Sequence, residues 1–442
     1  MNARPTQALS TGRVFALWWP LAASWMLMAI EAPMFTAVVA RMPGPERALA
    51  AYGSLVLPLA LVIEAPVIML LAASTALSKS REAYARLGRF TLTLGVVLTA
   101  LHVLVAFTPL FDLIAVRAID APASVVEPGR IGLRMMTPWT LSIAWRRYQQ
   151  GLLIRFERSR QVGLGTLVRL GANATVLLAG YTYGGLPGIV VGTAGISAGV
   201  VGEALFIHAC ARPVVRERLA PAAPDEAPLT RRAFVGFYAP LAVTPLMTLA
   251  IQPIGAAAMG RMPESLASLA AWPAVHALVF LLRSPGMAFN EVVVSLAGDA
   301  ESRRVLRRVA GFAAVALVLA LAVFAATPLA KLWFAGVLGL TPRLTALART
   351  GVALAVLMPG YQVLQSLFQG ALVRAHTTRP ITEAVALYAG CASVALFVGV
   401  RLAPAPGIAV AVVSFTVAGV LQTCWLWWRS RHAVLPGKAP SA

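Results

Sequence analysis

Charged residues are scarce in this chain: Asp, Glu, Lys and Arg make up only 12% of its 442 residues. Soluble domains carry about twice that fraction. Hydrophobic residues make up 59% of the chain, and the mean hydropathy is +0.77. A soluble protein with so few polar groups could not cover its own surface. The composition therefore excludes a soluble domain and predicts a protein that lies in a lipid bilayer.

Residue patterns that carry catalysis or bind metals are also missing. The three cysteines, Cys210, Cys391 and Cys424, show no CxxC or metal-ligand spacing, so we expect neither a disulfide framework nor a metal site. The five histidines are scattered and form no HExxH motif, whereas a membrane enzyme needs clustered catalytic groups. No GxxxxGK(S/T) loop is present, which argues against an ATP-driven pump. We expect that the protein is not an enzyme and needs no cofactor.

Apolar stretches long enough to cross a bilayer as a helix, about 20 residues, recur along the whole chain. This pattern predicts an all-α polytopic membrane protein with twelve transmembrane helices. The helices are expected at 14–40, 48–77, 88–111, 131–155, 162–182, 188–210, 233–258, 266–297, 305–327, 347–373, 381–400 and 406–428.

The two halves of the chain repeat one another. At an offset of 220 residues, the tripeptide RMP at 41–43 falls on RMP at 261–263. Further along, QGLLIR from Gln150 matches QGALVR from Gln369. A six-helix unit is therefore duplicated, and both copies keep the same orientation because six is even. This predicts two parallel six-helix repeats that form two lobes related by a pseudo-twofold axis along the membrane normal.

Domain boundaries follow from the longest polar connection, which separates the two repeats. We expect a monomer that binds a small-molecule substrate. Its expected parts are an N-lobe with helices 1–6 at 1–210, a cytoplasmic linker at 211–232, a C-lobe with helices 7–12 at 233–428 and a cytoplasmic tail at 429–442.

Basic residues outnumber acidic ones, 37 to 17, and give a formal net charge of +20. They lie in short clusters between the spans and form no continuous stripe, so no nucleic-acid partner is expected. Connections on one side of the spans hold 23 Lys and Arg residues, and those on the other side hold 9. Because cytoplasmic loops are enriched in Lys and Arg, we predict a multi-pass protein of the cell (inner) membrane with both termini cytoplasmic.

Charged residues inside the spans are candidates for function, because a charge at the bilayer centre costs at least ~2.5–3.5 kcal/mol on insertion scales. Arg146 and Arg147 lie about 13 Å from the cytoplasmic end of their helix, near the midplane. Arg169 reaches a similar depth on the next helix. Arginines bind carboxylate or phosphate with two parallel hydrogen bonds, so these three predict a basic substrate pocket. Alternatively, they pair with Glu203 or extend toward the headgroups.

Glu64 and Arg283 occupy matching positions in the repeats, since IEAP at 63–66 corresponds to RSP at 283–285. Matching positions on the inner faces of two lobes would face each other across the axis. We therefore expect Arg283 to contribute to substrate binding and Glu64 to ion coupling, with contact between them in one conformational state. The alternative is a static buried pair without a role in transport.

Glu31 is a second candidate for ion coupling. Pro33 frees backbone carbonyls nearby, and intramembrane carboxylates often mark proton or sodium pathways. The repeat counterpart of Glu31 is Ile251 or Gln252, neither of which titrates. The alternative is a carboxylate satisfied by a neighbouring Ser or Arg. His276 and Glu203 are further cavity candidates, and His276 is equally a hydrogen-bonded packing residue.

The sixth span carries glycines at three- and four-residue spacing. This spacing lets helices approach closely and predicts a packing surface without chemistry. The glycines are Gly188, Gly192, Gly195, Gly199 and Gly202.

Three stretches carry a resemblance to a known family: LAAYGSLVLPLALVIEAP from Leu49, LAAWPAVHALVFLLRSP from Leu269 and AWRRYQQGLLIRFERS from Ala144. With the twelve spans in two parallel repeats, they resemble the multidrug/oligosaccharidyl-lipid/polysaccharide (MOP) transporter superfamily, whose largest branch is the MATE proteins. Within it, the stretches are most similar to the progressive ankylosis (ANKH-like) family.

This resemblance implies lobes in a V shape, alternating access and efflux coupled to a proton or sodium gradient. The ankylosis branch implies export of organic or phosphate-bearing anions such as citrate, pyrophosphate or nucleotides, whereas the MATE branch implies antiport of cationic drugs. Many MATE proteins carry an acidic Asp in the first span, where the nearest match here is Glu31. The intramembrane arginines favour anions. A flippase for lipid-linked precursors is a further alternative, because it also needs a basic central cavity.

Overall fold

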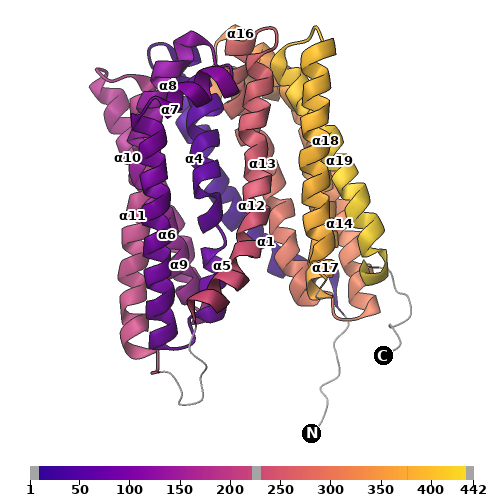
Figure 1. The fold of residues 1–442 in the computed structure, drawn as a ribbon. Helices are drawn as coiled ribbons and strands as arrows, with labels where there is room; N and C mark the ends of the chain where they lie inside the picture. Colours follow the sequence, from indigo (N-terminus) through magenta and orange to yellow (C-terminus); the bar gives the residue numbers. More distant parts are fainter. Residues whose placement is uncertain (1–8, 222–229, 376, 435–442) are drawn as a thin grey trace.

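The computed structural model describes residues 9–221, 230–375 and 377–434, which contain helices and no β-strand. The helices stand side by side in two lobes, with most of the N-terminal half on the left of Figure 1 and most of the C-terminal half on the right. This confirms the predicted all-α, two-lobe membrane fold. The N-terminal half contains α1 (Thr11–Ala29), α2 (Glu31–Val39), α3 (Pro45–Ala51), a π-helix (Tyr52–Val56), α4 (Leu57–Glu64), a 3-10 turn (Ala65–Val67), α5 (Leu70–Leu77), α6 (Arg81–Phe107), α7 (Leu110–Asp112), a π-helix (Leu113–Ala118), α8 (Ala123–Met135), α9 (Thr137–Arg155), α10 (Ser159–Tyr183) and α11 (Gly188–Glu217).

The C-terminal half has the same order of elements. Its first helix begins, and its last helix ends, at the end of the molecule where α1 begins and α11 ends (Figure 1), as an even number of spans per repeat requires. Its elements are α12 (Arg231–Gly260), α13 (Ser265–Leu296), α14 (Ala300–Ala326), α15 (Pro328–Lys331), a π-helix (Leu332–Val337), α16 (Pro342–Leu354), α17 (Met358–Arg374), α18 (Arg379–Leu402) and α19 (Gly407–Val434).

Each of the twelve predicted spans is helical. Within the described ranges, ten helices or runs of joined helices are long and apolar enough to cross a membrane. An eleventh span consists of α16 and α17, which meet at an angle of 41°. The remaining span corresponds to α8 and α9, and its apolar content is lower because α9 carries Arg146, Arg147 and a pair of glutamines.

The duplication is visible where helices begin. The side chain of Ser80 accepts a hydrogen bond from the backbone N–H of Ala83 at the start of α6. At the start of α14, Asp299 accepts from the N–H of Ser302 at 2.7 Å. Ser80 and Asp299 are 219 residues apart, the same offset as the two QG motifs. Each cap satisfies an N–H that has no partner inside the helix, which stabilises a helix by about 1 kcal/mol.

The first part of each half's first helix packs on the opposite half. On α1, Trp18 donates its indole N–H to the carbonyl of Pro285 on α13 at 2.7 Å. On α12, Tyr238 donates to the carbonyl of Pro66, and Phe234 packs edge to face on Phe90 of α6. Further along, each of these spans packs on its own half. In the N-terminal half, α2 packs on α10 and α11. In the C-terminal half, α12 packs on α18 and α19. The two halves are therefore crossed at the end where α1 and α12 begin.

Two spans of the N-terminal half are interrupted beside their glutamates. α1 ends at Ala29, and α2 begins at Glu31, two residues before Pro33. α4 ends at Glu64 and gives way to a 3-10 turn that contains Pro66. Proline lacks the N–H that would continue the helical ladder. Each carboxylate therefore lies at a helix break in the membrane interior, whereas α12 and α13 run through their own prolines without a break.

The glycines of α11 lie at close helix contacts, as their spacing predicts. A Cβ on Gly192 would lie 2.3 Å from the ring of Phe35 on α2. A Cβ on Gly199 would lie 2.9 Å from the carbonyl oxygen of Arg169 on α10. Only glycine allows these approaches, and the second one positions Arg169.

The run GISAG at 195–199 also has the letters of the GxSxG motif of serine hydrolases. That motif works at a sharp turn between a strand and a helix. Here Ser197 lies inside α11 and donates to the carbonyl of Met135 at 3.0 Å. The serine is a packing residue and not a nucleophile.

We expect Gly199→Val to destabilise the protein by several kcal/mol, because overpacking a tight contact costs about 1–3 kcal/mol and more where backbone is the neighbour. Thermal unfolding in detergent measures the effect. Gly171→Val on α10 is the matched control, because a Cβ there meets nothing within 4 Å. Equal stability of the two variants would show that the α10–α11 contact is looser than described.

Candidate functional site

A cluster of charged side chains lies inside the N-terminal half, where α2, α4, α9, α10 and α11 meet. Its members are three arginines and three glutamates, so their formal charges balance. Most of them are buried, and Glu203 has no exposed surface. The members are Glu31, Glu64, Arg146, Arg147, Arg169 and Glu203.

Arg146 and Glu203 form a buried ion pair between α9 and α11. The Nη1 of Arg146 lies 2.7 Å from Oε2 of Glu203. The other carboxylate oxygen accepts from the side-chain amide of Gln150 at 3.0 Å. Buried charges of this kind need partners and hydrogen bonds to offset the loss of water. The pairing alternative for Arg146 is therefore the one realised in this structure.

Arg169 binds Glu31 with two hydrogen bonds, one of which joins Nε to Oε1 at 2.9 Å. Asn173 donates to the same carboxylate oxygen at 3.1 Å. The Nη1 of Arg169 also lies 3.8 Å from Glu203. The arginine thus links the two carboxylates, and Glu31 is satisfied by an arginine, as its alternative interpretation states.

Arg147 and Glu64 have no direct ionic partner within 4 Å among the described residues. Arg147 follows Arg146 by about 100° around α9, and its Nε is buried without a hydrogen-bond acceptor. Glu64 is 6% exposed and accepts a hydrogen bond from the indole N–H of Trp139. The two groups are near enough to interact electrostatically. They are the least compensated members of the cluster.

The C-terminal half repeats one of these contacts without charge. Positions 219 residues after Arg146 and Glu203 are occupied by Gln365 and Gln422. The side-chain amide of Gln365 donates to Oε1 of Gln422 at 3.1 Å, between α17 and α19. Arg169 is replaced in the same register by Tyr388. The ionic cluster therefore belongs to one half only.

Arg283 is the charge at the matching depth of the C-terminal half. Its Nε and Nη2 donate to the amide oxygen of Gln362 at 3.1 and 2.5 Å. Its guanidinium carbon lies 5.7 Å from the ring centre of Tyr361, a cation–π contact. No carboxylate lies within 4 Å of it among the described side chains. Its positive charge is hydrogen-bonded but not neutralised.

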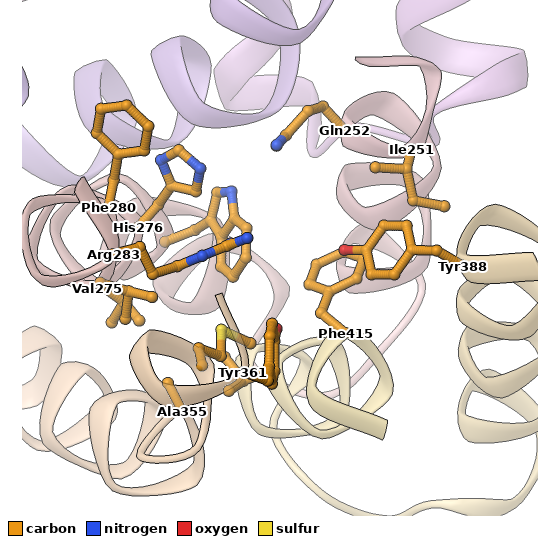
Figure 2. Close-up of a pocket in the computed structure, with 14 residues that line it drawn as sticks. Ile251, Gln252, Val275, His276, Phe280, Arg283, Ala355, Tyr361, Tyr388 and Phe415 are labelled. Atoms are coloured by element: carbon orange, nitrogen blue, oxygen red, sulfur yellow. The ribbon is translucent and has the colours of Figure 1, made fainter. Parts of the chain in front are cut away.

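Arg283 faces a small cavity of about 60 Å³. Figure 2 shows the side chains of Arg283, His276, Gln252 and Tyr388 directed toward the same space from α12, α13 and α18. Aromatic rings, including Phe415, form the rest of the wall. A single water needs only about 10–15 Å³, so the cavity has room for a few waters or a small group. Its wall combines one cation, several hydrogen-bonding groups and aromatic faces.

A second cavity of about 40 Å³ adjoins the first. The two share Gln252, Trp272 and His276 as lining residues. Apart from Pro273, the other lining residues of the second cavity belong to the N-terminal half and include Ala32, which follows Glu31, and Tyr52. Gln252 and His276 therefore stand between the half that carries the ionic cluster and the half that carries Arg283.

The structure brings together only some of the predicted site residues. Arg146 and Arg169 share Glu203, and in this state both pair with carboxylates; the basic substrate pocket stays a prediction. Glu64 and Arg283 bind Trp139 and Gln362 and do not contact each other in this state. His276 lines both cavities. Its ring lies parallel to that of Phe280 and at an angle to that of Trp272.

The sequence analysis did not predict the neutral side chains around Arg283, because it considered only charged residues inside the spans. Gln362, Tyr361 and Tyr388 contact or surround the guanidinium. The repeat register contained the signal for one of them, since Tyr388 stands where Arg169 stands in the first copy. No group of three His, Cys, Asp or Glu side chains in the described ranges is arranged to hold a metal ion.

No family profile and no curated protein sequence matches the chain. Solved structures do match. An inward-facing multidrug resistance MATE family transporter of the MOP superfamily is similar over 95% of this chain and 98% of its own, with a TM-score of 0.67 and 16% identity. The lipid II flippase MurJ, in an inward closed conformation, is similar over 93% and 87%, with a TM-score of 0.72 and 13% identity.

A third structure, a MOP superfamily transporter from Pyrococcus furiosus, is similar over 98% of this chain and 99% of its own, with a TM-score of 0.64 and 15% identity. It is described as having a binding pocket of reverse polarity that suggests a different function. The chain has a MATE-like fold. At these identities the likeness establishes the fold alone, so the predicted MATE-like fold is confirmed, whereas membership of the MOP superfamily and the closer resemblance to the ankylosis family stay predictions.

The matched structures are described as transporters and a flippase. The ionic cluster lies inside the N-terminal half, the cavity next to Arg283 lies inside the C-terminal half, and the second cavity lies where the two halves meet.

Proposed function

We propose that the chain is a secondary active transporter that works by alternating access and exports organic or phosphate-bearing anions. The observation that carries the anion assignment is Arg283, an intramembrane arginine with a neutral glutamine as its hydrogen-bond partner. It borders a cavity in the C-terminal half, next to the cavity that both halves line. Intramembrane ionisable residues of this kind mark substrate pathways. Citrate, pyrophosphate and nucleotides belong to the class that a guanidinium binds well.

The charge balance of the interior supports the same class of substrate. The three arginines of the N-terminal cluster are offset by three glutamates, and Arg283 adds one positive charge. A carboxylate or phosphate oxygen that enters the cavity would replace the missing counter-charge. A cationic drug in this cavity would instead meet a guanidinium and no carboxylate among the lining residues, an arrangement that disfavours it.

Ion coupling is proposed for Glu64 and Glu31. Glu64 is held by an indole N–H and has no arginine within 4 Å among the described residues. Glu31 is held by Arg169, so binding of a proton or sodium ion there requires the pair to part. A cation that binds Glu31 would release Arg169 toward Glu203, which is already 3.8 Å away.

Counterflow in proteoliposomes tests the proposal. Vesicles loaded with unlabelled citrate or pyrophosphate are expected to accumulate the labelled form of the same anion, and this exchange should require the protein. A labelled cationic dye is expected not to accumulate. Uptake of the dye alone would overturn the anion assignment and favour the MATE-type antiporter.

The lipid-precursor flippase is a second candidate, and a groove on the surface favours it. The groove has a volume of about 650 Å³ and lies between α6 and the start of α12. Leu94, Val97 and Phe234 form apolar wall, and Arg86 and Arg89 lie at the groove. It shares no lining residue with the cavities next to Arg283, so it offers no direct route from lipid to that site. Movement of a fluorescent lipid-linked pyrophosphate between leaflets, without exchange of soluble anions, would favour the flippase.

A further inference from the structure

Two arginines connect the lobes at the end of the molecule opposite the start of α1. They are Arg41 and Arg261, the first residues of the two RMP motifs at 41–43 and 261–263. Each one follows the first span of its half and reaches across to the other half. The contacts lie near α8 and α16, at the upper end in Figure 1.

Arg41 binds the C-terminal half through backbone carbonyls. Its Nη2 donates to the carbonyls of Gly336 and Val337 at 3.0 and 2.9 Å. Its Nη1 donates to Ala37 on its own helix at 2.6 Å, which holds the side chain in place. Gly339, with φ of +73°, lies against the guanidinium, and a Cβ there would come within 3.0 Å of it.

Arg261 repeats this arrangement in the opposite direction. Its Nη2 donates to the carbonyl of Ala118 at 3.0 Å, and its Nη1 donates to that of Ile119 at 3.3 Å and to Ala257 of its own helix at 2.7 Å. Asp120 stands where Gly339 stands in the other copy, and its carboxylate lies 3.8 Å from Nε of Arg261. The lobes come close here, because a Cβ on Gly260 would lie 2.8 Å from the carbonyl oxygen of Asp120.

The bound carbonyls belong to the ends of the two π-helices, Leu113–Ala118 and Leu332–Val337, or follow directly after them. The last carbonyls of a helix have no partner within the helix and carry partial negative charge. An arginine that spans two of them satisfies both and adds charge-assisted hydrogen bonds. In both copies these bonds join different lobes.

We infer that Arg41 and Arg261 form a symmetric pair of latches that hold the lobes closed at this end, and that both must release for the interior to open there. This inference rests on the proposed alternating access, and it assigns the RMP motif a role in the conformational change. By the predicted orientation this end faces away from the cytoplasm. The latches are unequal, because only Arg261 has a carboxylate beside it.

Distance measurements between spin labels test the latches without any substrate. Labels at Ser124 on α8 and Ala346 on α16 report the separation of the two halves at this end, in a background where Cys210, Cys391 and Cys424 are replaced. Arg41→Ala and Arg261→Ala are each expected to raise the ratio of open to closed molecules about tenfold, the effect of losing hydrogen bonds to a charged group. The double variant should exceed both.

Arg343→Ala is the matched control. Arg343 lies at the same end and pairs with Glu264 of the same half at 3.4 Å, so its loss should leave the distances unchanged. If the double alanine variant fails to fold, Arg41→Lys and Arg261→Lys replace it, because a lysine keeps the charge but cannot span two carbonyls as a guanidinium does. They should still raise the open fraction.

Wild-type distances in a folded double variant, alanine or lysine, would overturn the latches. This outcome is distinct from failure of the proposed function. If the double variant raises the open fraction as expected but the wild-type protein exchanges no anion, the latches are supported and the anion proposal is wrong. If the wild-type protein exchanges anions but the label distances in the double variant are those of wild type, the anion proposal is supported and the latches are wrong.

Discussion

Gln362→Glu is expected to lower anion exchange at least tenfold. The substitution keeps the shape of the side chain and places a carboxylate where Arg283 now has an amide oxygen at 2.5 and 3.1 Å. The guanidinium would then form an ion pair, and the positive charge that we assign to substrate recognition would be neutralised. Because a charge-assisted contact is worth about 1.5–3 kcal/mol, its loss corresponds to a change of about ten- to a hundredfold in affinity. Labelled pyrophosphate exchange in proteoliposomes measures it.

The control for this experiment lies on the same helix. Gln369→Glu makes the same chemical change on α17, about 10 Å further along, at a residue that lines neither cavity. It should leave exchange close to wild type. Arg283→Gln should reproduce the loss caused by Gln362→Glu. Full exchange in both Arg283→Gln and Gln362→Glu would remove Arg283 from the substrate site.

Glu203→Gln is expected to destabilise the protein by about 3–5 kcal/mol, the cost of leaving the partner of a buried ion pair uncompensated. Glu203 has no exposed surface, and Arg146 is only 5% exposed. Without the carboxylate, Arg146 keeps its charge in an interior that cannot solvate it. Thermal unfolding in detergent, followed by the loss of monodisperse protein, measures the effect.

The repeat itself supplies the variant that should repair the damage. Arg146→Gln combined with Glu203→Gln recreates the amide pair that Gln365 and Gln422 form in the other half at 3.1 Å. Replacing both partners of a buried ion pair by uncharged groups is often close to neutral. The double variant should therefore be more stable than either single variant, which is a strong positive coupling.

Arg429 and Glu383 provide the comparison pair. They form an ion pair of 3.1 Å near the end of α19 with more exposed side chains, where loss of the pair should cost less than about 1 kcal/mol. If Glu203→Gln and Glu383→Gln lowered the stability by the same amount, this would contradict the account. The interior cluster would then be hydrated, and its charges would not need one another as partners.

The sequence was sufficient to predict the fold because its signals are long and redundant. Twelve apolar stretches and a register that holds from the RMP motifs to the QG motifs determine the number of helices and their parallel repeat. The crossing of α1 and α12 between the halves was not predictable in this way. It depends on single contacts such as Trp18 with Pro285, which no periodicity records.

The site was predictable in its residues but not in its pairings. Depth along a helix follows from counting residues, and it predicts similar depths for Arg146 and Arg169. In the structure both arginines lie within 4 Å of Glu203. The rotation of each helix does not follow from counting when a break intervenes, and Glu64 lies directly at such a break. The contact between Glu64 and Arg283 is therefore absent in this state, and each residue has a neutral partner.

The neutral partners of these residues could not be predicted from sequence, for a chemical reason. A charge inside a span is costly and therefore indicates function, whereas Gln362 and Gln365 resemble ordinary polar residues of a helix. Only the comparison of the two copies shows that Gln365 and Gln422 replace an ion pair and that Tyr388 replaces Arg169. In the C-terminal half this asymmetry leaves Arg283 without a carboxylate within 4 Å among the described residues.

The most direct measurement of the whole mechanism is the reactivity of a cysteine at Gln252, the residue shared by the two cavities. In protein without its native cysteines, Gln252→Cys is treated with a membrane-impermeant thiol reagent from each side of the vesicle. Labelling from both sides, slowed from both by pyrophosphate, is the result expected of an anion site with alternating access. Labelling from one side only under all conditions, or labelling that no anion slows, would contradict it.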